Sequence, residues 1–473
     1  MTKINKTFIE IISKIQPEKL TGIEITNIIN KILSIKNKTD KDIDCFMSKF
    51  KNLNINNQNL IPYIISNNNT FNFNLSSNQI MSIIEKSNLN TQYYNGWTLP
   101  MILFTCNKTQ KLNLSTNQII SILEKSDMSI QGLNGWTAPM TLLLNNKSQN
   151  LNLSPEQIMS VLEKSNLFTQ DNYGWSLLMT ILLYNKTQNL NLSPNQIMSV
   201  LEKTKTLQQP KQLTKIAINI IKHNKEQNLN LSTEQIISIL EKSDLSDKSN
   251  QGNTILMQII KNNKNQNLNF SSDQIMSVIE KSNLNLQDYT GLTISMMLLE
   301  NNKKQKMRLL PNQIMSVIEK SDLSIQDNNG CTLPVYIIYY NKTQKLNLSP
   351  NQIMSVIEKS TLYEGKDYNM TIPRHVIKYN KTQKLNLSPE QITTIIKKIK
   401  PDNFSNTFID TFFLNLGDQF DLSKNQIHKI TKLFSNTKNI TPENQEKINQ
   451  ILLHHKIEQN LPLKHKTKIT IKL

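Results

Sequence analysis

The side chains that could do chemistry are few in this sequence, and most lack the spacing that catalysis or metal binding requires. The six histidines are scattered, and the adjacent pair His454 and His455 offers too few ligands for a metal site. No Gly-rich phosphate loop, nucleophile elbow, His-Glu-x-x-His or Cys-x-x-Cys is present. The sequence therefore predicts a non-enzymatic protein that uses no metal and no cofactor.

The candidates that do recur regularly are aromatic. Trp97, Trp136 and Trp175 follow one another at intervals of 39 residues. Tryptophan is a favoured anchor of protein interfaces, so a row of these rings along one edge predicts contact with a protein partner. The alternative is that each ring packs over the neighbouring turn. The tyrosines that flank the same turns and would enlarge a binding patch are Tyr94, Tyr173 and Tyr289.

The elements that must position these rings belong to a repeat. Residues 192–200 read Leu-Ser-Pro-Asn-Gln-Ile-Met-Ser-Val, and this stretch recurs nearly unchanged. Its serine recurs at multiples of 39 residues, at Ser76, Ser115, Ser154, Ser193, Ser232, Ser271, Ser349 and Ser388. Leu310 takes the place of serine in one copy. A period of this length is typical of a stacked array of small structural units.

Each copy of this stretch predicts the start of a helix, here named helix B. Ser193 and Gln196 have the spacing of a capping box, in which each side chain bonds the other residue's backbone N–H. Pro194 occupies the first helical position, where a missing N–H costs nothing. Apolar residues then follow at helical spacing from Ile197.

A second fixed point of the unit is a glycine that predicts a tight turn with positive φ. It falls at Gly96, Gly135, Gly174, Gly252, Gly291 and Gly330, with Asn369 on the same register. A Thr or Ser two residues later suits the N-cap of a second, short and apolar helix, here named helix A. Met140–Leu144 is one example, and helix A ends near an Asn-Lys pair such as Asn146-Lys147.

A polar connector joins helix A to helix B, as in residues 186–192. Two leucines alternate with asparagine in it. We expect an extended connector that places its leucines in the core and leaves the asparagine side chains to bond backbone or each other.

The unit resembles the ankyrin repeat. Asp327–Thr332 reads like that family's Asp-x-x-Gly-x-Thr turn, and Ile314–Asp327 reads like its second helix with the segment that follows. The unit is longer than the usual 33 residues, with the excess between the helices, and methionine replaces the family's histidine. The resemblance implies an all-α repeat solenoid of helix–turn–helix units with turn or hairpin fingers. It also implies partner contacts at the turn tips and the adjoining concave face.

Three regions are predicted along the chain. Residues 1–56 form a helical N-terminal cap with a degenerate repeat, and residues 57–400 form the ankyrin-like array. Residues 401–473 hold a degenerate final repeat, a last helix capped by Thr441 and a basic tail. Within the array, residues 205–214 lack the usual turn, so we expect a distorted finger or a bend there.

Composition limits the class of protein and the kind of partner that we expect. The N-terminus lacks the features of a conventional signal peptide and no apolar run is long enough to span a bilayer, so we expect no membrane insertion. Three cysteines without a pairing pattern favour a reducing cytoplasm. The composition and the resemblance to ankyrin repeats imply either the cell's own cytoplasm or that of a host into which the protein is delivered as an effector. We predict a monomer with a protein partner. The net charge of +18 leaves nucleic acid or another acidic surface as the alternative partner, unless the lysines are simply solvated.

Overall fold

The computed structural model describes residues 6–15, 22–50, 54–55, 58–93, 96–203, 210–249, 252–362, 371–399, 404–437 and 440–460. The chain falls into two compact units, each described here by itself. The first comprises Met1–Gln209 with His223–Gln235, and the second comprises Pro210–Lys222 with Ile236–Leu473. Within the described ranges, no helix combines the length and the apolar character that crossing a bilayer would require.

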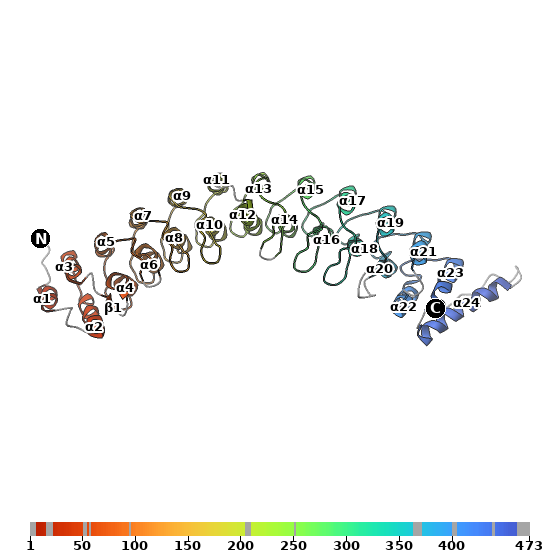
Figure 1. The fold of residues 1–473 in the computed structure, drawn as a ribbon, viewed down its shortest axis with the longest axis horizontal. Coiled ribbons are helices and arrows are strands. Elements are labelled where there is room, and N and C mark those ends of the chain that lie inside the picture. The colour runs from red at the N-terminus through yellow and green to blue at the C-terminus, as the bar shows by residue number, and fades with distance from the viewer. Residues whose placement is uncertain are drawn as a thin grey trace. The chain divides into compact units, whose positions relative to one another are not determined.

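The repeats each contribute one helix A and one helix B, which confirms the predicted all-α repeat solenoid (Figure 1). The helices A are α4 (Leu60–Asn67), α6 (Leu99–Cys106), α8 (Ala138–Leu144), α10 (Leu177–Tyr184), α12 (Pro210–His223), α14 (Ile255–Asn262), α16 (Ile294–Asn301), α18 (Leu333–Tyr340) and α20 (Ile372–Tyr379). The helices B are α5 (Ser77–Glu85), α7 (Thr116–Glu124), α9 (Pro155–Lys164), α11 (Pro194–Lys203), α13 (Thr233–Leu240), α15 (Ser272–Glu280), α17 (Pro311–Glu319), α19 (Pro350–Lys359) and α21 (Pro389–Lys397).

Additional elements flank the repeats at both ends. The N-terminal ones are α1 (Lys6–Lys14), α2 (Gly22–Leu33), α3 (Asp40–Phe50) and the two-residue strands β1 (Asn54–Ile55) and β2 (Gln58–Asn59), which pair antiparallel. The C-terminal ones are α22 (Asn406–Asn415), α23 (Lys424–Phe434) and α24 (Pro442–Asn460). Ser423 forms a capping box at the start of α23, and the Thr441 hydroxyl accepts from the Asn444 N–H at the start of α24. The final tail, residues 461–473, lies outside the described residues.

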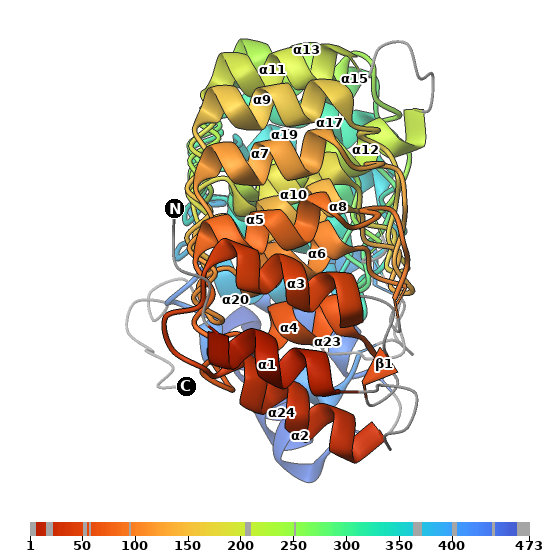
Figure 2. The same cartoon turned by 90° about the vertical axis from the view of Figure 1, so that its left-hand side faces the viewer.

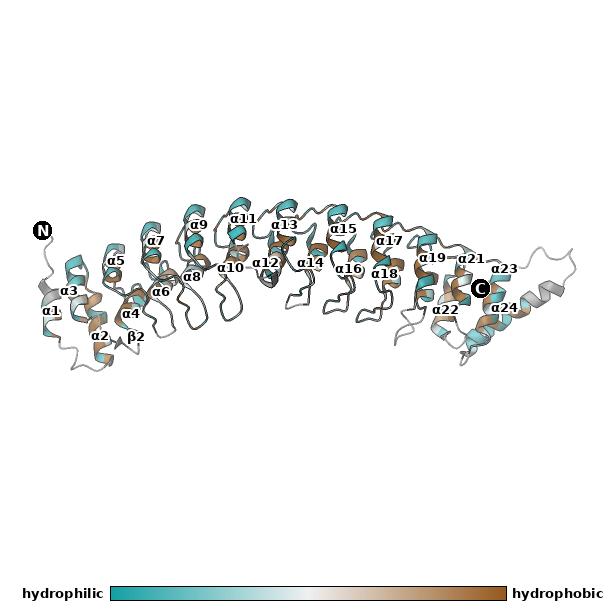
Figure 3. Cartoon of the chain, turned by 45° about the horizontal axis from the view of Figure 1, so that its top comes forward, coloured by the Kyte–Doolittle hydropathy of each residue, from teal (hydrophilic) through white to brown (hydrophobic). Residues whose placement is uncertain are grey.

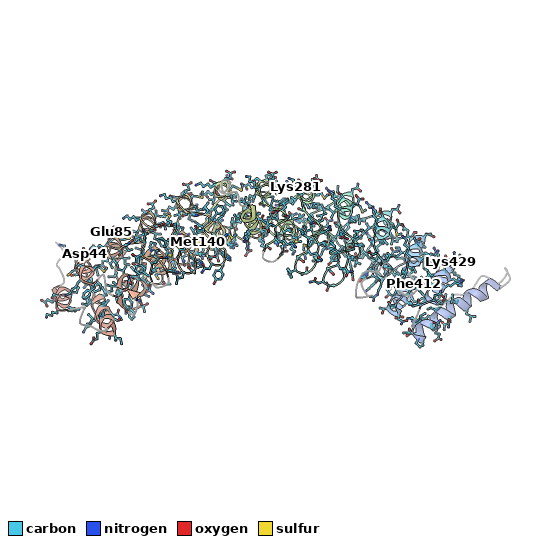
Figure 4. All side chains as sticks on the ribbon, viewed as in Figure 1. Asp44, Glu85, Met140, Lys281, Phe412 and Lys429 are labelled. Atoms are coloured by element: carbon cyan, nitrogen blue, oxygen red, sulfur yellow. The ribbon has the colours of Figure 1, made fainter. Side chains whose placement is uncertain are left out.

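Helices of the same kind stack side by side within each unit. Helix α6 packs between α4 and α8 in the first unit, and α16 and α18 pack between α14 and α20 in the second. Looking along the first unit, the helices B lie one behind another (Figure 2). The helices A are the more hydrophobic row and the helices B carry the polar outer faces (Figure 3). Met140 accordingly lies inside the first unit, while Glu85 points outward from α5 (Figure 4).

The helices B begin where the serine pattern predicts. In α9, the Gln157 N–H donates to Ser154 Oγ over 3.3 Å, and Gln157 Oε1 accepts from the Ser154 N–H over 2.9 Å. These two bonds satisfy two backbone donors that would otherwise lack a partner at the helix start. Leu310 precedes α17 without a hydroxyl, so only the bond from its N–H to Gln313 Oε1, of 2.9 Å, remains there.

Replacing Leu310 with serine should restore this capping box. We expect the free energy of unfolding to rise by about 0.5–1 kcal/mol, because a serine N-cap supplies a missing acceptor. Removing the side chain of Leu310 costs little because it is 61% exposed. Urea denaturation of the full chain measures the change. Ser349→Ala, at the same place in α19, should shift stability by a similar amount in the opposite direction.

The connectors differ from the predicted extended form. Asn189 and Asn191 have φ of 52° and 51°, and the equivalent residues of the other connectors are also left-handed. Asparagine tolerates this region best after glycine. The alternation still turns both leucines inward, so Leu190 and Leu192 are buried as predicted. The prediction of an extended backbone was wrong. A backbone in which every second residue is left-handed also turns successive side chains to opposite sides, so the alternation of leucine and asparagine does not identify an extended connector.

The irregular repeat has a lengthened helix A. Residues 204–209, which include half of the predicted distorted finger, lie outside the described residues. Helix α12 begins at Pro210, whereas the start of α10 at Leu177 corresponds to Ile216 one period later. Helical backbone thus occupies the place where other repeats form the second half of the finger.

Candidate functional site

The fingers are tight turns, and an Asp carboxylate holds those that begin at Asp171, Asp288 and Asp327. In the finger before α10, Asp171 Oδ1 accepts from the backbone N–H of Tyr173 over 2.9 Å and of Trp175 over 2.8 Å. Gly174 lies between them with φ of 77°, a conformation that glycine adopts without strain. Asp327 Oδ1 makes the equivalent bonds in the finger before α18. The sequence Asp-x-x-Gly therefore builds a rigid turn, as predicted.

Glutamine side chains stack neighbouring fingers. Gln131 Nε2 donates to the Gly135 carbonyl in its own finger over 2.7 Å and to the Gln170 carbonyl of the next finger over 2.8 Å. Gln92 in the first unit and Gln287 in the second make the same pair of bonds. Because each side chain bridges two turns, the fingers within a unit form a continuous edge with a fixed backbone.

Two of the three tryptophans are engaged by the following finger. Trp136 Nε1 donates to Asp171 Oδ2 over 3.0 Å. The Trp97 ring lies over Gly132, where an added Cβ would come within 2.8 Å of Trp97 Cδ1. Both side chains are half-buried. Their rings therefore contribute to the stacking of fingers.

Trp175 is more exposed than the other two tryptophans, and two further exposed side chains lie on the same finger and the one before it. Its exposed fraction is 42%, while those of Tyr173 and Leu133 are 81% and 73%. The residue that corresponds to Asp171 one period later is Pro210, the first residue of α12, so the repeat after Trp175 offers no equivalent carboxylate. We name Leu133, Tyr173 and Trp175 the finger-tip patch.

The backbone fixes the members of the finger-tip patch relative to one another. Asn172 Nδ2 donates to the Leu133 carbonyl over 2.8 Å, and the Asn172 N–H donates to the Asn134 carbonyl over 3.1 Å. These bonds join the tips of two neighbouring fingers, so the backbone at Tyr173 is held close to the backbone at Leu133. Tyr289 is 75% exposed on a finger of the second unit and is not part of this patch. Tyr94 lies outside the described residues.

A buried asparagine at the end of each helix A was not predicted from the sequence. Asn185 Oδ1 accepts from the Leu192 N–H over 2.8 Å, and Asn185 Nδ2 donates to the Asn228 carbonyl of the next repeat over 3.4 Å. A glutamine of the next repeat adds a further bond between neighbouring repeats. Gln149 Oε1, for example, accepts from the Lys108 N–H over 3.1 Å. The recurring Asn-Lys-x-Gln could have revealed this, since eight copies keep both amides on one register.

An aromatic cluster on the helices A of the second unit was also missed. Tyr339 Oη lies 3.2 Å from His375 Nε2, and the Tyr339 and Tyr379 rings are 5.0 Å apart. Burial, together with the hydrogen bond to Tyr379, raises the pKa of Tyr339 to about 12, and burial lowers the pKa of His375. Tyr336 donates to Asp327 Oδ2 over 2.8 Å, which ties the cluster to a finger. Tyr339 and His375 are therefore neutral at pH 7 and interact as hydrogen-bonding partners.

The ionisable groups near the fingers have structural partners. Lys261 Nζ lies 3.1 Å from Asp288 Oδ2, and Thr290 also donates to the Asp288 carboxylate. Burial alone would raise the pKa of Asp288, but the hydrogen bonds from Thr290 and Lys261 outweigh it and lower the pKa. Within the described ranges, His, Cys, Asp and Glu form no group of three or more that could hold a metal ion.

Comparison with known proteins gives structural likenesses only. No protein-family model and no curated protein matches the chain. The ankyrin repeat domain of Bcl-3, a member of the IkappaB family, is 11% identical with a TM-score of 0.32, and covers 54% of this chain and 98% of its own. An ankyrin repeat protein from Leishmania major is 12% identical with a TM-score of 0.33, and covers 58% and 86%.

A third solved structure is similar in a comparable stretch. It is the complex of a predatory endopeptidase from Bdellovibrio bacteriovorus with an immunity protein. The matched chain is 14% identical with a TM-score of 0.22, and the match covers 52% of this chain and 92% of that one. Ankyrin repeat proteins are thus among the structures to which this chain is similar, and its repeats keep the ankyrin-like order of finger, helix A and helix B.

Proposed function

We propose that this chain is a non-enzymatic repeat protein that binds another protein through the finger-tip patch of its first unit. The observation that carries the proposal is the exposure of Leu133, Tyr173 and Trp175 on two adjoining fingers. Exposed apolar side chains that gather in one place mark interaction sites, whereas scattered ones carry no such meaning. Tyrosine and tryptophan are also the side chains most often found at the energetic centre of an interface.

The stiffness of the fingers supports the same proposal. A partner that binds a mobile loop must order it first, which costs affinity. The patch already stands on turns held by Asp171 and joined by Asn172 and Gln131. Binding would therefore fix only three side chains. We infer a partner with an apolar pocket lined by hydrogen-bond acceptors for the Tyr173 hydroxyl and the Trp175 N–H.

The wider role that we propose is that of a scaffold or a host-directed effector. This follows from the resemblance to ankyrin repeats and from the composition of the chain, and it does not alter which surface would bind. Trp97 and Trp136 are assigned to finger stacking instead, because Trp136 bonds Asp171 and Trp97 covers Gly132.

Truncating the patch should abolish partner capture without unfolding the chain. The test variant combines Leu133→Ala, Tyr173→Ala and Trp175→Ala, and the control is Leu414→Ala on α22, a leucine that is 76% exposed. Capture from a cytosolic lysate should fall at least tenfold for the first and stay unchanged for the second, since each lost anchor costs about 2 kcal/mol or more. Equal retention of the same proteins by both variants would refute the role of the patch.

A further inference from the structure

The lysines of the second unit are not spread evenly over its surface. Four consecutive connectors, residues 264–270, 303–309, 342–348 and 381–387, contain no acidic residue. Their cations are Lys264, Lys303, Lys304, Lys306, Arg308, Lys342, Lys345, Lys381 and Lys384, and all nine side chains are exposed. We name these nine residues the basic edge.

The left-handed backbone of the connectors turns the cations outward. Lys306 and Arg308 both have φ of 55°, and the residues that follow each of them, Met307 and Leu309, are buried. Lys345 and Lys384 occupy the same left-handed position, with φ of 54° and 52°. A non-glycine residue in this region costs free energy, so the presentation of lysine there is maintained by the surrounding bonds.

Those bonds make the basic edge a fixed row of charges. Asn302 Oδ1 accepts from the Leu309 N–H over 2.9 Å, and Gln344 Oε1 accepts from the backbone N–H groups of Lys303 and Lys304 over 3.2 Å. The asparagine before each connector also donates to a backbone carbonyl of the next connector, from Asn263 to Gln305, from Asn302 to Gln344 and from Asn341 to Lys384. Lys381 pairs with Asp421 over 3.2 Å at the end of the row, but both side chains are largely exposed, so this pair neutralises little.

A hollow lies between the first two connectors of the basic edge. Its volume is about 490 Å³. Lys264, Lys306 and Arg308 line it together with the hydroxyl-bearing Ser271 and Ser272. Cations beside hydroxyl groups are the donor set that phosphate oxygens accept from in complexes with nucleic acids.

The chemistry of the basic edge distinguishes among anionic partners. Its apolar side chains, such as Phe270 and Met307, are buried, and no described aromatic side chain of these connectors is exposed. A protein that binds a membrane surface inserts apolar side chains, and a protein that binds single-stranded nucleic acid stacks aromatic rings on the bases. Protein interfaces are depleted of charge at their centre. A row of cations without exposed rings matches the phosphate backbone of a duplex.

We propose that the basic edge binds the phosphate backbone of a nucleic-acid duplex without reading its sequence. Lysine and arginine neutralise phosphates and release condensed counterions, which gives affinity that falls steeply with salt. The absence of exposed aromatic side chains leaves base edges unread, so DNA and RNA duplexes of any sequence share the relevant chemistry. This surface belongs to the second unit and does not depend on the finger-tip patch.

The test measures fluorescence anisotropy of a labelled 24-base-pair DNA duplex against the full chain between 50 and 200 mM salt. The test variant replaces Lys303, Lys304, Lys306 and Arg308 with glutamine. The control replaces Lys242, Lys281, Lys320 and Lys359, which are exposed at the ends of helices B in the same unit, so the net charge is identical. We expect the test variant to lose about 0.9 in the slope of log affinity against log salt for each phosphate contact removed, and affinity to fall at least tenfold.

Several outcomes would overturn the proposal. Equal losses in both variants would mean that net charge alone attracts the duplex. Tighter binding to a single strand of the same sequence, or equal displacement by polyglutamate, would assign the basic edge to a different partner. An RNA duplex that binds like the DNA duplex supports the proposal, and circular dichroism of each variant confirms that its helices are retained.

Discussion

Replacing Asn341 with leucine is expected to lower the free energy of unfolding by roughly 2–4 kcal/mol. Asn341 is buried at the end of α18, where its Oδ1 accepts from the Leu348 N–H over 2.9 Å. Its Nδ2 donates to the Lys384 carbonyl of the next repeat over 3.0 Å. Leucine has nearly the same size but leaves both backbone groups without partners, and an orphaned buried group costs about 1–3 kcal/mol.

Urea denaturation of the full chain measures this loss. Asn312→Ala serves as the matched control because Asn312 is exposed on α17, and it should change stability by less than about 0.5 kcal/mol. A loss of similar size in both variants would mean that the buried amides do not hold the repeats together. The same Asn341 variant should also loosen the connectors at Lys342 and Lys384, which hydrogen exchange would detect as faster exchange there.

The second large effect is expected at Gly291, where two fingers approach closely. Its φ is 78°, and a Cβ added there would lie 2.7 Å from the backbone nitrogen of Asn328 in the next finger. Gly291→Ala therefore adds a backbone collision to the cost of a left-handed alanine. The left-handed conformation costs about 1–2 kcal/mol, and overpacking adds typically 1–3 kcal/mol.

Gly252 provides the control for this prediction. Its φ is 72°, but an added Cβ would approach no closer than 3.8 Å to the Tyr289 nitrogen, an ordinary contact distance. Gly252→Ala should therefore show the conformational cost alone. Thermal unfolding of the two variants side by side measures the difference, and equal shifts would show that the fingers are not stacked tightly.

The repeat could be predicted because its signals are local. A serine and a glutamine three residues later bond within one helical turn, as Ser154 and Gln157 do. The glycine of each finger is required by its own backbone angle. Neither inference needs knowledge of a neighbouring repeat, and both were confirmed for the described residues.

The features that were missed depend on the neighbouring repeat. Asn185 and Gln149 look like ordinary polar loop residues until the backbone of the neighbouring repeat is in place to hydrogen-bond with them. The left-handed backbone of Lys306 and Arg308 has no signal in their own side chains, because lysine and arginine do not favour it. Aligning the repeats under one another, rather than reading each alone, would have exposed the Asn-Lys-x-Gln pattern.

The tryptophans illustrate the same limit. Their spacing predicts equivalent positions, but the surroundings of each ring are set by the finger that follows. Trp136 donates to Asp171 and Trp97 covers Gly132, whereas the residue at the same sequence interval after Trp175 is Pro210, the first residue of α12. The three tryptophans thus share one position in the repeat but differ in exposure, and their spacing alone does not predict which of them is exposed.

The proposed role of the finger-tip patch is tested most directly by photo-crosslinking from a single position. A photoreactive amino acid at position 173, in place of Tyr173, would stand within the patch, and one at position 125, in place of Lys125, would stand on the helix B side of the same unit. In a cytosolic lysate, we predict a discrete protein adduct from position 173 that survives a high-salt wash and disappears when Leu133 and Trp175 are changed to alanine. The same adducts from both positions, or none from position 173, would contradict the proposed function.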